Sequence, residues 1–193
     1  MVSLQSGCPS PAFLGSGDSA SFPDQGGEAS VLEYHGTLAF WTGDYQQAFS
    51  YYEQSIVLNE EIGDYNNDWA RVNMGYTRLR QGNVAKAIDI FELCLQHFQK
   101  ENTVIGLVYT LEGYASLYVN QDQPERAAQL FAWADGIREK IDDRRPPLEQ
   151  ASVDKDLEVI HSKVNDAEYA KLCAEGLGMT TEQAIAFVFK ESR

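Results

Sequence analysis

Residues 75–94, GYTRLRQGNVAKAIDIFELC, carry the pattern that decides the fold. It consists of a small residue, a turn residue, Ala, a large aromatic residue and a second small residue, here Gly75, Gly82, Ala87, Phe91 and Cys94. Two further copies have the same offsets: Gly36, Gly43, Ala48, Tyr52 and Ser55 before it, and Ala115, Asp122, Ala127, Phe131 and Ala134 after it. A period of about 40 residues is typical of helical repeats, whose stacked units share a core.

Each copy is predicted to form two antiparallel helices separated at its turn residue, because apolar residues on both sides recur at helical spacing. The small residues Gly36, Gly75 and Ala115 would let the two helices approach, and the aromatic residues would fill the space that the approach leaves. Helices are expected from 29 to the Gly43 turn, then over 45–62, 67–81, 84–100, 104–120 and 124–141.

The predicted organisation has three parts. Residues 1–28 are rich in Gly, Ser and Pro and are expected to form a flexible segment. Three repeats follow, over 29–66, 67–103 and 104–143. Residues 144–193 are expected to form a helical cap, with helices near 148–163 and 166–175 and a last one that begins at Thr180 with Gln183. The second of these helices is expected to have a capping-box-like start at Asn165 and Glu168 and to end at Gly176-Leu177-Gly178.

Composition excludes several classes of partner. The 193 residues carry 15 basic and 29 acidic side chains, a net charge of −14, with no basic cluster of the kind that binds nucleic acid. No apolar run reaches the roughly 18 residues that a membrane span needs. The first basic residue is Arg71, which does not fit a secretory or transit leader. The three cysteines are far apart and are expected to be reduced, so we expect a cytoplasmic protein.

No pattern of catalytic or metal-binding residues stands out. His35, His97 and His161 fall on three different expected helices, and no His-Glu-x-x-His or Gly-x-Ser-x-Gly motif occurs. His35 precedes the small residue of the first repeat, where we expect it at the edge of the core. The sequence therefore predicts a protein that is not an enzyme, with no catalytic residues, cofactor or metal ion.

The repeated residues resemble the tetratricopeptide repeat (TPR), whose pattern has small residues, a turn glycine, Ala and aromatics at the positions quoted above. At the aromatic position that opens the second helix, only the first copy keeps an aromatic, because Tyr45, Val84 and Pro124 stand there. The resemblance implies an all-α fold: a TPR-like right-handed α-α superhelix of three helical hairpins plus C-terminal capping helices.

A wider resemblance covers residues 29–190. The stretch from Pro124 to Ala128, together with the tail from Gly176 to Ala186, is similar to the C-terminal TPR region of large bacterial regulators that join a STAND-type ATPase to a TPR array, some with a LuxR-type DNA-binding domain. This resemblance implies a sensor or interaction module. The chain itself has no Gly-x-x-x-x-Gly-Lys phosphate loop.

In the TPR superhelix the first helix of each repeat lines the concave face, so the resemblance assigns partner-binding residues by register. They are Tyr34, Thr37, Trp41, Trp69, Asn73, Tyr76, Arg80, Tyr109, Glu112 and Ser116. Aromatic residues and Arg are enriched in binding hot spots. The leading hypothesis is a scaffold that binds a protein or peptide in this groove. The alternatives are a small-molecule sensor of a signalling regulator and self-association, giving a homo-oligomer, through the N-terminal end of the array.

Overall fold

The computed structural model describes residues 25–63 and 67–190, and over these ranges the chain forms helices joined by short turns, without strands. The predicted all-α fold of three helical hairpins with C-terminal capping helices is confirmed. The helices are α1 (Gln25–Trp41), α2 (Tyr45–Glu61), α3 (Asp68–Arg80), α4 (Val84–Lys100), α5 (Val104–Asn120), α6 (Pro124–Ile141), α7 (Pro147–Lys163), α8 (Asp166–Leu177) and α9 (Thr181–Val188).

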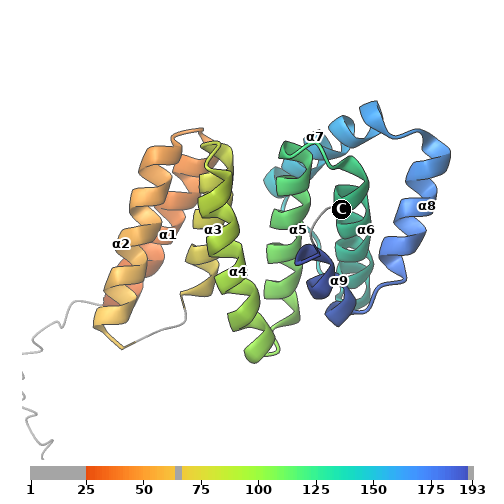
Figure 1. The fold of residues 1–193 in the computed structure, drawn as a ribbon. Coiled ribbons are helices and arrows are strands. Elements are labelled where there is room, and N and C mark those ends of the chain that lie inside the picture. The colour runs from red at the N-terminus through yellow and green to blue at the C-terminus, as the bar shows by residue number, and fades with distance from the viewer. Residues whose placement is uncertain (1–24, 64–66, 191–193) are drawn as a thin grey trace, which may run out of the picture.

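The hairpins α1/α2, α3/α4 and α5/α6 stack in chain order, and α8 extends the row by packing along α6 (Figure 1). Helix α7 leaves this row: it contacts both α5 and α6, and in Figure 1 it crosses the upper end of the last hairpin. Helix α9 packs against α5. The chain after the third hairpin therefore folds back over the array.

The turns between helices share one backbone feature. Each of the six turns from α1 to α7 has a residue with positive φ, which is Gly at Gly43, Gly63 and Gly82 and a short polar residue at Asn102, Asp122 and Asp142. Asn and Asp are the residues that tolerate this left-handed conformation best after Gly. This explains why Asp122 can stand where the first two repeats have glycine.

The close approach of the two helices in a hairpin is confirmed. A Cβ atom at Gly75 would lie 2.5 Å from Cε1 of Phe91, and one at Gly36 would lie 2.7 Å from Cε1 of Tyr52. Both aromatic rings are almost completely buried. The repeat pattern therefore records a steric match between a small residue on the first helix and a ring on the second.

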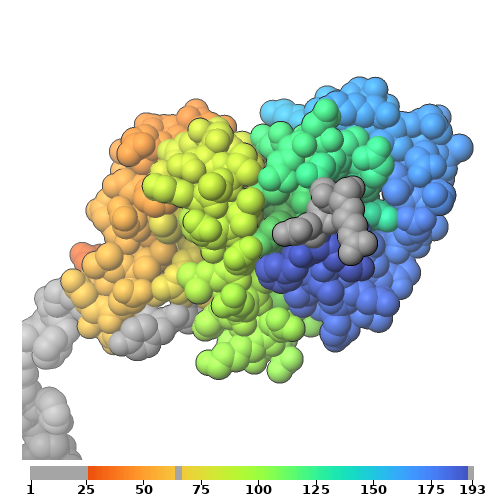
Figure 2. Space-filling model, viewed as in Figure 1, coloured from red at the N-terminus to blue at the C-terminus, as the bar shows by residue number. Residues whose placement is uncertain are grey.

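The apolar core has two parts. The larger extends from α3 through α9 and includes Phe91, Leu111 and Phe131. The smaller joins the first hairpin to α3 through Ala39, Ala48, Tyr52 and Ala70. In Figure 2 the first hairpin lies at one end of the molecule, and it contacts the rest through α3.

Most helix ends agree with the predicted ones, and two do not. Helix α1 begins at Gln25, so residues 25–28 of the expected flexible segment are helical, while residues 1–24 lie outside the described ranges. Of the expected stop at 176–178, only Gly178 caps α8; Gly176 lies inside the helix, where a Cβ would clash with the backbone carbonyl of Gln129 on α6, so its role is close helix packing. The Asn165 side chain caps the start of α8 by accepting from the backbone N–H of Glu168, and the full capping box lies at the start of α9, between Thr180 and Gln183.

Candidate functional site

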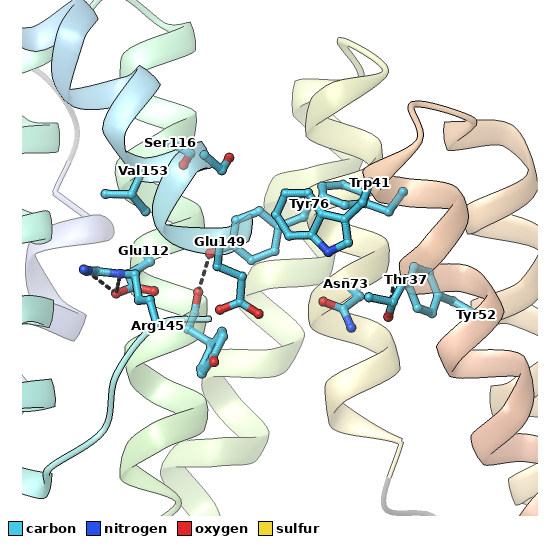
Figure 3. Close-up of a pocket in the computed structure, with 13 residues that line it drawn as sticks. Thr37, Trp41, Tyr52, Asn73, Tyr76, Glu112, Ser116, Arg145, Glu149 and Val153 are labelled. Atoms are coloured by element: carbon cyan, nitrogen blue, oxygen red, sulfur yellow. Dashed lines mark hydrogen bonds and ion pairs between the residues drawn. The ribbon is translucent and has the colours of Figure 1, made fainter. Parts of the chain in front are cut away.

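A pocket of about 130 Å³ lies where the first helices of the three hairpins face α7 (Figure 3). Helices α1, α3 and α5 line one side, together with one residue of α2, and α7 with the segment before it lines the other. The lining residues are Thr37, Phe40, Trp41, Tyr52, Asn73, Tyr76, Tyr109, Glu112, Ser116, Arg145, Glu149, Ser152 and Val153. The pocket thus joins all three hairpins to the C-terminal cap.

The structure brings together most of the residues that register assigned to the concave face. Seven line the pocket: Thr37, Trp41, Asn73, Tyr76, Tyr109, Glu112 and Ser116. Arg80 lies beside it and donates a hydrogen bond to the Ser152 hydroxyl on α7. Trp69 does not line it but packs edge-on to the lining residue Tyr109, with ring centroids 5.2 Å apart, and Tyr34 is 76% exposed on α1. Partner binding by these residues stays a prediction.

Six lining residues were missed by sequence reasoning: Phe40, Tyr52, Arg145, Glu149, Ser152 and Val153. Tyr52 was expected in the core, which it reaches, while its hydroxyl hydrogen-bonds to Thr37 at the pocket. Four of the six belong to α7 or to the segment before it. No local signal shows that α7 returns to the concave face, because its spacing predicts a helix and not its position.

Polar contacts hold α7 against the groove. The Ser116 hydroxyl of α5 donates to a carboxylate oxygen of Asp156 at 2.5 Å, and both residues are buried. Arg80 of α3 reaches the same helix at Ser152. Burial raises the pKa of Asp156, while the Ser116 hydrogen bond and the charge of Arg80 partly offset the increase. Helix α7 is therefore fixed to two of the three first helices.

The aromatic wall of the pocket is built from rings that support one another. Tyr76 packs edge-on to Phe91 with centroids 5.4 Å apart, and its hydroxyl donates to the backbone oxygen of Tyr109 at 2.8 Å. Trp41 packs edge-on to Phe40, with centroids 5.1 Å apart. Burial raises the pKa of Tyr76 well above its ordinary value, so its hydroxyl stays a neutral donor. These contacts fix the orientation of the rings.

A buried ion cluster supports the floor of the pocket. The carboxylate of Glu112 pairs with two arginines, Arg138 at 2.8 Å and Arg145 at 2.5 Å. Arg138 also pairs with Asp143, and Arg145 with Asp135 at 2.6 Å. The three central side chains are almost completely buried. Both guanidinium groups are thus already bound to carboxylates of the chain itself.

Glu149 differs from Glu112 because no ion pair joins it to any residue in the described ranges. Burial raises the pKa of its carboxyl group above the ordinary value. A hydrogen bond from Tyr109 and the charge of Arg138 lower it again in part, and the charges of Glu112 and Asp143 raise it. Glu149 is thus a partly desolvated carboxylate with no ion-pair partner among the described residues.

A second surface lies at the N-terminal end of the array. Val31, Tyr34 and Leu38 recur at helical spacing on α1, and more than half of each side chain is exposed. Exposed apolar stripes of this kind are typical of surfaces that associate. This is the end through which self-association was predicted, and the stripe supports that prediction without testing it.

The histidines and cysteines do not form a reactive group where the structure describes them. His35 is exposed beside Tyr51 and does not lie in the core, so that expectation was wrong; its ring stacks on a surface aromatic instead. His97 Nδ1 lies 2.7 Å from Asp68, and His161 stacks on Tyr169. Burial raises the pKa of Cys94 to about 12. Within residues 25–63 and 67–190, no three His, Cys, Asp or Glu residues gather to hold a metal ion.

Residues 27–100 match the family model described as the tetratricopeptide repeat. The match covers the first two hairpins and supports a TPR domain there; the third hairpin and the cap lie beyond it. Comparison with curated proteins and with solved structures gave no match. Every helix in the described part of the chain is too short or too polar to span a membrane.

Proposed function

We propose that this chain is a protein-interaction module whose pocket between the first helices and α7 binds a peptide or a segment of a partner protein. The TPR match supports a helical repeat module of the kind commonly used for protein interaction. The observation that carries the proposal is the pocket itself, in which rings and polar groups from all three hairpins and α7 converge. Such aromatic clusters within a concave surface are where binding energy concentrates.

The size of the pocket favours a single side chain over a larger ligand. Sites for drug-sized molecules usually measure about 300 to 1,000 Å³. A cavity of about 130 Å³ is closer to one that encloses a benzene-sized group. A partner segment would therefore lie along the groove and insert one residue. This speaks against drug-sized metabolites as ligands of this pocket.

Two tryptophans on first helices provide a matched test. We expect Trp41→Ala to weaken peptide binding by at least about 30-fold, since it removes a ring from the pocket wall and hot-spot truncations cost about 2 kcal/mol or more. Trp69→Ala removes a ring of the same type that does not line the pocket, and we expect affinity within about threefold of wild type.

The measurement is fluorescence anisotropy with peptides selected on the wild-type protein from a phage-displayed random library, with circular dichroism to show that both variants fold. Equal peptide affinity of wild type and Trp41→Ala would exclude the pocket as the binding site. Failure to select any peptide would count against peptide binding altogether.

Two wider roles extend this proposal. The chain resembles ATPase-linked regulators in the residues around Pro124 and Gly176 quoted above. In a regulator of that kind the pocket would be the site that binds the signal. Self-association is the other candidate, supported by the stripe of Val31, Tyr34 and Leu38. Sedimentation equilibrium over a range of protein concentrations tests it, because a monomeric mass throughout would exclude it.

A further inference from the structure

We infer that the pocket receives the protonated side chain of a lysine or arginine from the partner, held between the Glu149 carboxylate and the rings of Trp41 and Tyr76. This inference rests on the binding role proposed above and names the chemistry of the residue that enters. Figure 3 shows these three side chains around one space, contributed by α7, α1 and α3.

Charge is the first argument. Arg145, the arginine that lines the pocket, is bound by Glu112 and Asp135, and Arg138 beside it is bound by Glu112 and Asp143, so neither is available to an incoming anion. Glu149 lines the same pocket, and within the described residues it pairs with no cation. Burial of its carboxylate, which raises its pKa, is a cost that an incoming cation would offset. An anionic group would instead meet this carboxylate.

The aromatic wall is the second argument. Ring faces attract cations within about 6 Å of the centroid, most strongly for Trp. The chain already uses this contact internally: the guanidinium carbon of Arg78 lies 3.5 Å from the centroid of the Phe49 ring, and that of Arg138 lies 4.4 Å from the centroid of the Tyr109 ring. Trp41 and Tyr76 line the pocket and have no such cation among the described residues. A lysine or arginine from outside would complete the same arrangement.

A further polar group of the lining, Asn73, also suits a cation. The side-chain amide of Asn73 projects from α3 toward the space that Glu149 faces (Figure 3). Its oxygen can accept a hydrogen bond from an ammonium or guanidinium group, which donates and cannot accept. The pocket therefore offers a cation one charged acceptor, one neutral acceptor and two rings. The net charge of −14 on the whole chain would attract a basic partner from a distance.

The first test uses small probes and the indole N–H signal of Trp41 in ¹H–¹⁵N NMR spectra. The probes are n-butylammonium, n-butylguanidinium and the neutral n-butanol, which share a four-carbon chain and differ in the charge of the head group. We expect saturable shifts of the Trp41 signal with both cations and binding at least about tenfold weaker with the alcohol. Equal binding of the alcohol would overturn the inference.

Two variants on α7 identify the carboxylate. Glu149→Gln keeps the shape of the side chain and removes its charge, so we expect cation binding about tenfold weaker than wild type. Glu158→Gln makes the same change at an exposed position on the same helix that does not line the pocket, and should bind as wild type does. Undiminished cation binding by Glu149→Gln would exclude Glu149 as the anchor.

The selected peptides separate this inference from the proposed function. If both hold, the peptides are enriched in Lys or Arg, and replacing that residue by Gln weakens their binding to wild type but not to Glu149→Gln. Peptides whose binding needs Trp41 but no basic residue would support peptide binding in the groove and overturn the inference about the cation. If the small cations bind and no peptide is selected, the cation is a free amine and the assignment to a partner's side chain is wrong.

Discussion

Phe91 lies between two glycines from neighbouring helices. A Cβ at Gly75 of α3 would lie 2.5 Å from its ring, and one at Gly113 of α5 would lie 2.6 Å from it. One ring therefore determines the packing inside its own hairpin and the packing against the next. The same ring supports Tyr76 edge-on, so a residue in the core orients part of the pocket wall.

Glu149 leads to a prediction about pH. Burial raises the pKa of the Glu149 carboxyl group in the folded state. At pH values between the unfolded and folded pKa, the chain therefore takes up a proton when it folds. The ionised carboxylate thus lowers stability above the folded pKa, and this loss disappears as the pH falls below the ordinary value. We expect Glu149→Gln to be more stable than wild type near pH 7, with the difference shrinking toward pH 4. Urea unfolding at several pH values measures it.

The exposed Glu158→Gln variant is the control, and it should match wild type throughout this pH range. A Glu149→Gln protein less stable than wild type near pH 7 would show that the Tyr109 hydrogen bond outweighs burial. The same experiment has a second use. A variant that is folded and more stable but binds cations poorly cannot owe its weak binding to misfolding.

At the scale of elements, the Glu112 cluster joins three of them: α5, α6 and the segment that leads into α7. We expect Glu112→Gln to lower the free energy of unfolding by about 3–5 kcal/mol, because it leaves two buried guanidinium groups without their shared carboxylate. Glu60→Gln is the matched comparison, since Glu60 pairs with Arg71 at 2.9 Å on the surface.

Surface pairs contribute about 1 kcal/mol or less, so Glu60→Gln should unfold almost as wild type does. Urea denaturation followed by circular dichroism measures both variants. Similar losses in the two would mean that the cluster is no more important to stability than a surface pair. The cluster also sets the path of the chain into α7, and through it the position of Glu149.

At the scale of the molecule, the two cores predict uneven stability. Helices α1 and α2 are held by the smaller core, and α3 to α9 share the larger one. In repeat proteins each unit is stabilised mainly by its neighbours, so an end unit with a small interface opens first. Hydrogen exchange should therefore be fastest in the first hairpin and slowest in α5 and α6. Equal protection of α1 and α5 amides would show one cooperative unit.

The sequence by itself determined the hairpins and most helix ends. The match between Gly75 and Phe91 spans one hairpin, and turn residues such as Gly82 and Asp122 act through their own backbone conformation, so local spacing carries the information. Seven of the ten residues predicted from the repeat register likewise line one pocket, because residues on the same face of equivalent helices face the same groove.

Only the tertiary structure decided what closes that groove. The spacing of α7 predicts a helix but not the distant surface on which it packs, and Glu149 meets Tyr109 from a separate element. For the same reason Gly176 was expected to be part of a helix stop, whereas only Gly178 caps α8 and Gly176 lets α8 approach α6. Periodicity records which residues lie on one face, whereas the partner of that face depends on contacts between residues far apart in the chain.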